Sequence, residues 1–81
     1  MQSIIEIDLH GKNCHQAKVA VDAALRRARP GVMRLRVIHG CNGGTALRDM
    51  IRARYRNHPK VLRIELGFNS GETDLILREL T

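Results

Sequence analysis

The sequence predicts a two-layer α/β sandwich of the α+β kind, in which two helices cover one face of a four-stranded mixed sheet. Four short segments alternate between apolar and polar residues, as half-buried strands do, and two longer segments repeat their apolar residues at helical spacing. The predicted order is therefore β-α-β-α-β-β. Strand–helix–strand units favour right-handed parallel crossovers with the helices packed on the sheet. The other face of the sheet is expected to be open.

The first half of the chain is predicted to be one strand–helix–strand unit. In residues 4–10 aliphatic side chains point to one side and polar side chains to the other, which is typical of a half-buried strand. Asn13 is a good N-cap residue and Gln16 completes a capping box, so a helix is expected over residues 14–29. Residues 33–38 alternate again and are predicted to form the second strand.

The second half opens with a glycine-rich loop, residues 40–45, from which a second helix is expected to run to about Asn57. Pro59 begins a third strand, and a turn at residues 67–71 leads to a fourth strand at residues 73–80. Charged residues on the polar sides of the strands agree with an open sheet face. They are Glu6, Asp8, Arg34, Arg36, Arg63 and Glu65.

Composition and charge favour a small nucleic-acid-binding protein. A chain of 81 residues suffices for one hydrophobic core, so residues 1–81 are predicted to be a single domain. Fourteen lysines and arginines against eight acids give a net charge of +6, which attracts a polyanion through counterion release. Only 2% of the residues are aromatic, so stacking of bases on aromatic side chains is poorly supported.

Several other classes of protein are disfavoured. No apolar stretch approaches the roughly 20 residues of a membrane span, and the N-terminus does not resemble a secretion signal. The two cysteines, Cys14 and Cys41, are expected to be free thiols, which fits a reducing cytoplasm. Neither a Walker A motif nor a dinucleotide fingerprint occurs, so no nucleotide cofactor such as ATP or NAD is implied.

A short motif recurs at the ends of the first two predicted strands. Leu9-His10-Gly11 and Ile38-His39-Gly40 lie 29 residues apart, and each precedes a predicted helix. In a parallel pair of strands both motifs lie at the same edge of the sheet. Ligands of open α/β sheets gather at this edge, and helix N-termini there offer N–H groups to anions.

Asp8 and His10 are the candidate catalytic residues of this edge. They are two positions apart on a strand and therefore share its polar face. A carboxylate beside an imidazole can orient the ring for proton transfer, and the pair also offers ligands to a divalent metal ion. An isolated Asp-x-His pair on an exposed strand is more often solvated surface, and both interpretations stay open at this point.

The candidate phosphate-binding residues lie in the second motif, the glycine loop and the helix that follows. His39 is either a buried histidine bonded to a loop carbonyl or a phosphate contact. The glycines let the backbone approach an oxyanion, or serve only to turn the chain. Arginines repeat every four residues along the second helix, as a solvated face or a phosphate-binding stripe. The full set is His39, Gly40, Gly43, Gly44, Thr45, Arg48 and Arg52.

Four motifs follow one another in a single order: Ile7-Asp8-Leu9-His10-Gly11, Ile38-His39-Gly40, Ala46-Leu47-Arg48 and Gly67-Phe68-Asn69-Ser70-Gly71-Glu72-Thr73. Over essentially the whole chain, this set resembles the Smr (small MutS-related) domain in a stand-alone form. The resemblance implies a fold related to the C-terminal domain of translation initiation factor 3, nucleic-acid binding and, in several members, endonuclease activity. By position, Asp8 and His10 match residues associated with cleavage, and His39 and Gly40 match residues associated with substrate contact.

One segment departs from the family pattern. Many members have His-Gly-x-Gly with Lys or Arg at x, whereas the loop after His39-Gly40 is one residue longer and uncharged at that position. This difference bears on cleavage more than on binding.

Two leading hypotheses use the same cations. In the first, the protein is an endonuclease, a hydrolase of phosphodiester bonds in DNA or RNA. The loop, Arg48 and Arg52 hold phosphates, His10 is the general acid or base, and Asp8 orients it or holds a divalent ion such as Mg²⁺ or Mn²⁺. In the second, the protein binds nucleic acid without cleaving it. A weaker third hypothesis is a protein-interaction module that docks a partner on the open sheet face.

Overall fold

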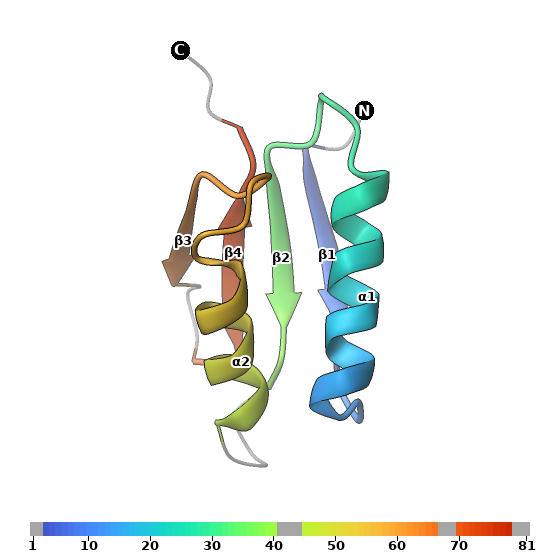
Figure 1. Ribbon diagram of the computed structural model, residues 1–81, viewed down its shortest axis with the longest axis vertical. Helices are drawn as coiled ribbons and strands as arrows, with labels where there is room; N and C mark the ends of the chain where they lie inside the picture. The colour runs from blue at the N-terminus through green and yellow to red at the C-terminus, as the bar shows by residue number, and fades with distance from the viewer. Residues whose placement is uncertain (1–2, 41–44, 67–69, 79–81) are drawn as a thin grey trace.

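The computed structural model describes residues 3–40, 45–66 and 70–78, and its elements follow the predicted order (Figure 1). They are β1 (Ile4–Asp8), α1 (Cys14–Arg27), β2 (Arg34–Ile38), α2 (Ala46–Tyr55), β3 (Arg63–Leu66) and β4 (Glu72–Ile76).

Several elements end before the hydrophobic pattern does. α1 stops at Arg27 because the next residue already has an extended backbone as the chain approaches Pro30. β4 stops at Ile76 because the next two N–H groups both bond the carbonyl of Met33, which ends the regular ladder. β1, α2 and β3 are also shorter than predicted. The end of the predicted fourth strand, residues 79 and 80, lies outside the described residues.

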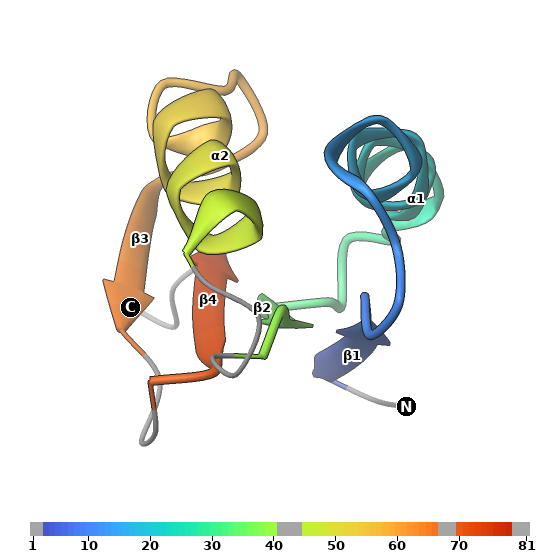
Figure 2. The same cartoon turned by 90° about the horizontal axis from the view of Figure 1, so that it is seen from below.

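The sheet has the strand order β1-β2-β4-β3. β1 and β2 are parallel, and the two pairs that involve β4 are antiparallel. Both helices lie on the same face of the sheet (Figure 2). These observations confirm the predicted mixed sheet with two helices on one face. The last strand of the chain is inserted between β2 and β3, so β4 is central and is buried on both of its faces.

The hydrophobic core fills the space between the helices and the sheet face that they cover. Buried residues of α1 recur at helical spacing, and buried residues of β2 alternate. Each large aliphatic side chain removed from water contributes about 1.5–3 kcal/mol to folding. The buried cluster consists of Leu9, Ala17, Val21, Leu25, Leu35, Val37, Ile51, Tyr55, Val61 and Leu75.

The uncovered face of the sheet carries a network of ion pairs. Asp74 of β4 is 2% exposed and accepts hydrogen bonds from Arg34 Nη1 at 2.6 Å and from Arg36 Nε at 3.1 Å. Arg34 also pairs with Glu65, and Arg36 pairs with Glu72. The hydrogen bond to Asp74 raises the pKa of Arg36. The two arginines are therefore more than the solvent-facing charges that the sequence suggests, because they neutralise a buried carboxylate.

A second polar network joins the two helices. The buried hydroxyl of Tyr55 donates to Asp22 Oδ1 at 2.6 Å, and Arg54 Nη2 donates to Asp22 Oδ2 at 3.0 Å. Burial by itself would raise the pKa of Asp22, but the hydrogen bonds from Tyr55 and Arg54 outweigh burial and lower it. Burial, and then the bond to Asp22, raises the pKa of Tyr55 to about 12. The network fixes α1 against α2 by polar contacts as well as by packing.

Candidate nucleic-acid interface

The two recurring motifs meet at the edge of the sheet where β1 and β2 end. The strands are parallel, with Asp8 opposite Ile38, and the N–H of Leu9 bonds the carbonyl of Ile38 at 2.8 Å. Both helices begin at the same edge (Figure 1). We call this region the carboxyl edge and define it as residues 8–13, 38–40, 45–52 and 70–73.

Each motif turns at a glycine with positive φ, +80° at Gly11 and +77° at Gly40. An added Cβ would meet no atom within 4 Å at either glycine, so backbone conformation and not space favours glycine there. The remaining loop glycines of the predicted site, Gly43 and Gly44, lie outside the described residues together with Cys41. Their part in phosphate binding stays a prediction.

Asp8 anchors the turn that carries His10. β1 ends at Asp8, two residues earlier than predicted, and Asp8 Oδ1 accepts the backbone N–H of His10 at 2.9 Å. Both side chains are exposed, and no hydrogen bond joins the carboxylate to the imidazole. Among the described residues the imidazole has no partner. The carboxylate therefore positions the His10 backbone, which leaves the ring free at the surface.

His39 is the buried histidine of the carboxyl edge, with 6% of its surface exposed. Its Nδ1 is 2.9 Å from the carbonyl oxygen of Gly40, and its Nε2 is 2.9 Å from Thr73 Oγ1. Arg52 Nε donates to the same hydroxyl oxygen at 3.1 Å. A carbonyl only accepts, so Nδ1 carries the proton and Nε2 accepts from the Thr73 hydroxyl. This geometry matches the buried-histidine alternative, whereas phosphate contact by His39 stays a prediction.

Replacing Thr73 by valine tests this chain of hydrogen bonds. Thr73 is fully buried, and valine has nearly its shape but no hydroxyl, so Nε2 of His39 and Nε of Arg52 both lose their partner. We expect Thr73→Val to lower the free energy of unfolding by about 1–3 kcal/mol in urea denaturation. Thr73→Ser keeps the hydroxyl and should lose only about 1 kcal/mol with its methyl group. Equal losses in the two variants would contradict the proposed bonding.

The two helices differ in how their N-termini are satisfied. At α1 the predicted capping box is present: Gln16 N–H donates to Asn13 Oδ1 at 2.8 Å, and Asn13 N–H donates to Gln16 Oε1 at 3.0 Å. At α2 the Thr45 side chain makes no cap to the helix backbone, and its hydroxyl donates to Asp49 Oδ2 at 2.9 Å. Within the described residues, the first N–H groups of α2 therefore have no side-chain cap and are available to an anion.

The predicted arginine stripe begins beside this helix start. Arg48 Nε donates to Asp49 Oδ1 at 3.1 Å. Hydrogen bonds from Thr45 and then Arg48 lower the pKa of Asp49, so its carboxylate stays charged and offsets part of the Arg48 charge. The Arg52 side chain is held at the carboxyl edge by its hydrogen bond to Thr73 Oγ1. Within the described residues, both arginines use only Nε, which leaves their Nη groups for a ligand.

The carboxyl edge does not fit a preformed metal centre. Over residues 3–40, 45–66 and 70–78, no group of three or more His, Cys, Asp or Glu side chains is placed to hold a metal ion. Asp8 and His10 provide two donors, and the Asp8 carboxylate already accepts a backbone N–H. Hard divalent ions prefer six or more oxygen ligands. No step of a reaction is therefore assigned to a metal here.

Charge is distributed unequally between the uncovered sheet face and the rest of the molecule. The uncovered face holds three arginines against five acids, 3 − 5 = −2, in the part of the chain that the structure describes, and two of these acids, Asp8 and Glu72, lie where this face meets the carboxyl edge. The other described residues hold eleven cations against Asp22 and Asp49, 11 − 2 = +9. A polyanion is therefore attracted to the helices and the ends of the molecule, and away from the uncovered sheet face.

Comparisons with known proteins agree with this architecture. Residues 7–73 match the family model of the Smr domain. The chain belongs to the Smr domain family. The crystal structure of the Smr domain of Thermus thermophilus MutS2 is 35% identical to the chain and superposes with a TM-score of 0.81, covering 93% of this chain and 99% of that one. No curated protein matches the sequence. Smr domains are a family associated with nucleic-acid binding and nuclease activity.

Two further residues organise the site of this Smr domain: sequence reasoning missed Thr73, and it noted Asp49 only as the acid at a pairing position beside the arginine stripe. Thr73 links His39 to Arg52, and Asp49 engages both Thr45 and Arg48. The Asp49 contacts follow from spacings of one and four residues on a helix, so they were open to prediction. The Thr73 contacts were not, because they depend on β4 lying beside β2.

Neither helix in the described residues is long and apolar enough to cross a membrane.

Proposed function

We propose that this Smr domain binds the sugar–phosphate backbone of nucleic acid at its carboxyl edge and hydrolyses a phosphodiester bond there. The observation that carries the proposal is the state of His10. Its imidazole is exposed and without a described partner, while Asp8 holds its backbone at the same edge as the uncapped start of α2. A free imidazole at the same edge as a helix start that can bind an anion is suited to proton transfer at a bound phosphate.

The cations and backbone donors of the edge hold the substrate. The N–H groups at the start of α2 receive a phosphate oxygen, and the Nη groups of Arg48 and Arg52 contact the neighbouring charge. His39 acts indirectly, because its bonds to Gly40 and Thr73 fix the turn and the position of Arg52. His10 then transfers the proton of the attacking or leaving oxygen, while the arginines offset the charge that develops at phosphorus.

Asp8 and His10 variants test the catalytic half of the proposal. His10→Ala should lower the cleavage rate about 10²–10⁴-fold, the usual contribution of a general acid or base, and leave binding intact. Asp8→Asn keeps an oxygen that accepts the His10 N–H, whereas Asp8→Ala removes it. If Asp8 acts only by positioning, Asp8→Asn retains most activity and Asp8→Ala does not. The assay measures cleavage of labelled single-stranded, double-stranded and structured DNA and RNA, with and without Mg²⁺ or Mn²⁺.

The control is Glu6→Gln, which removes one exposed acid from the same face of β1. It should cleave like the parent. The unfolding free energies of His10→Ala and Asp8→Asn should stay within about 0.5 kcal/mol of the parent, since both side chains are exposed. Full cleavage by His10→Ala would overturn the catalytic assignment.

Binding without cleavage is the second candidate function. It is favoured by the loop after Gly40, which is one residue longer than the common family pattern and lacks its cation. In that case parent and variants bind equally well and none cleaves any of the substrates.

A further inference from the structure

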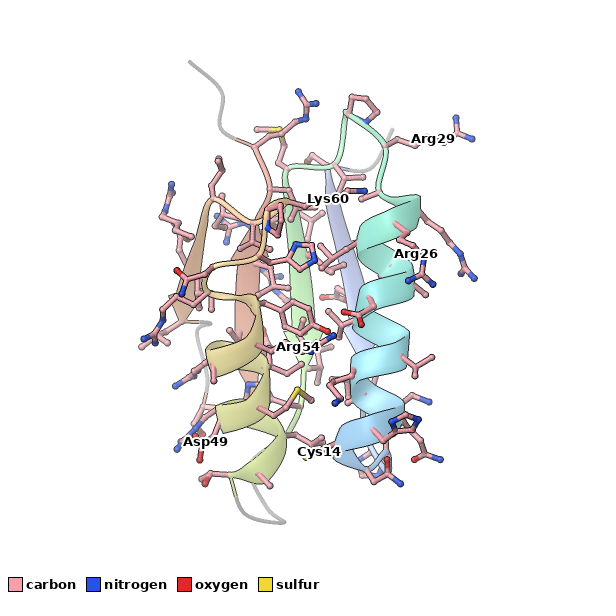
Figure 3. All side chains as sticks on the ribbon, viewed as in Figure 1. Cys14, Arg26, Arg29, Asp49, Arg54 and Lys60 are labelled. Atoms are coloured by element: carbon pink, nitrogen blue, oxygen red, sulfur yellow. The ribbon has the colours of Figure 1, made fainter. Side chains whose placement is uncertain are left out.

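A second group of cations lies at the end of the molecule opposite the carboxyl edge. Figure 3 shows Arg26, Arg29 and Lys60 at this end, whereas Asp49 lies at the other. The group combines the end of α1, the segment before β3 and the segment after β4. We call it the distal surface; it consists of Arg26, Arg27, Arg29, Lys60 and Arg78, all of them exposed.

Two of the five cations of the distal surface have no role in the described part of the fold. None of its five cations forms an ion pair with a described residue. Lys60 Nζ donates to the Leu25 carbonyl at 3.1 Å, and Arg26 and Arg27 lie in the last turn of α1, so these three also complement a helix C-terminus. Arg29 and Arg78 lie outside any helix or strand, and helix complementation does not account for them.

The distal surface surrounds a hollow of about 590 Å³. Both prolines of the chain, Pro30 and Pro59, line it, which gives it stiff walls. Leu62, 60% exposed, also lines it, and Leu62 N–H bonds the Ile76 carbonyl at 2.7 Å, which fixes the backbone that carries this side chain. The hollow thus presents apolar contact area beside the guanidinium groups of Arg29 and Arg78.

We infer that the distal surface is a second contact for the sugar–phosphate backbone of the same nucleic acid, which is a duplex of at least one helical turn. The inference rests on the proposed function at the carboxyl edge. Apolar area beside cations suits a backbone in which sugars alternate with phosphates. The two surfaces lie at opposite ends of a molecule whose largest dimension is 37 Å, so they are separated by no more than about this length. One turn of a duplex spans about 34–36 Å, so a straight duplex along the helices is long enough to reach both surfaces.

The charges on the surface between the two ends do not repel a duplex that lies along the helices. The described acids of the helices are Asp22 and Asp49, and arginine bonds both of them. The opposite path, across the uncovered sheet face, meets the excess of acids described above. An acidic peptide with an apolar anchor is the competing occupant of the hollow, but it would leave the cations outside the hollow, Arg26 and Arg27, without a ligand.

The experiment measures the salt dependence of binding for duplexes of about 6, 10 and 20 base pairs by fluorescence anisotropy. The number of phosphates contacted sets the slope of log K against log salt, and this slope is independent of how many overlapping sites a longer duplex offers. We expect a steeper slope for the 10- and 20-base-pair duplexes than for the shortest one. Arg29→Gln and Arg78→Gln should each reduce the slope by about 0.9, and the affinity about fivefold, for the longer duplexes only.

Two further variants make the outcomes distinguishable. Arg48→Gln, at the carboxyl edge, should weaken binding of all three lengths, and Arg63→Gln removes one charge from β3 and should change none. If no length binds, the proposed function itself fails. If all lengths bind with one slope, or the distal variants weaken the shortest duplex equally, only the distal contact is overturned. It is also overturned if a labelled Glu- and Leu-containing peptide binds in an Arg29-dependent way while duplex binding is unaffected by Arg29→Gln.

Discussion

Asp74→Ala is expected to lower the free energy of unfolding by about 2–4 kcal/mol, although the residue is remote from the proposed site. Asp74 is 2% exposed and accepts hydrogen bonds from both Arg34 and Arg36. Without it, the half-buried guanidinium groups of Arg34 and Arg36, which are neighbours on β2, lose the buried carboxylate that they share. They keep only the less buried carboxylates of Glu65 and Glu72. Loss of one partner from a buried ion pair costs more than the pair contributes, because the remaining charges stay desolvated.

The variant series separates this charge effect from a loss of packing. Asparagine has the same shape as aspartate but no charge, and only its amide oxygen accepts hydrogen bonds. The Asp74→Asn variant should therefore lose most of the free energy of unfolding that Asp74→Ala loses. Glu6→Gln removes an equal charge from an exposed position on the same face and should change stability by less than about 0.5 kcal/mol. Urea denaturation gives the three values. An Asp74→Ala variant as stable as Glu6→Gln would show that the network contributes nothing to folding.

The stability of the protein is expected to fall between pH 10 and pH 12, and Tyr55 is the cause. The pKa of Tyr55 is raised to about 12, chiefly by burial and then by its bond to Asp22. Because the pKa of Tyr55 is higher in the folded state than in the unfolded state, the contribution of Tyr55 to stability is complete below about pH 10. This contribution is lost as the pH rises through the folded-state pKa. A pKa raised from the ordinary value to about 12 corresponds to a loss of roughly 3 kcal/mol.

The chain offers a direct measurement, because Tyr55 is its single tyrosine and it has no tryptophan. Near-ultraviolet absorbance of tyrosinate follows the titration of this residue alone. We expect a midpoint near the raised pKa in the folded protein and near the ordinary value in urea. Tyr55→Phe should be less stable at neutral pH by about 1 kcal/mol and should lack this part of the alkaline decline. A folded-state midpoint near pH 10 would contradict the described network.

Local patterns in the sequence predict most of the architecture. Periods of two and 3.6 residues identify the strands and helices, because each depends on side chains a few positions apart. The capping box at Asn13 and Gln16 follows for the same reason. That the motifs of His10 and His39 lie at one edge also follows, since any parallel pair of strands brings its carboxyl ends together. The exposure of Asp8 agrees with the alternation of the first strand, whereas His10 lies in the turn that follows the strand.

The strand order is decided by tertiary structure alone. Nothing in the period of residues 72–76 indicates that they lie between β2 and β3, yet that position buries Asp74 between two arginines and brings Thr73 to His39. Tyr55 and Asp22 are separated by 33 positions and meet only when the helices pack together. Hydrophobic periodicity records which side of an element is buried. It carries no record of which distant element covers that side, so the polar partners of buried groups appear only in the folded molecule.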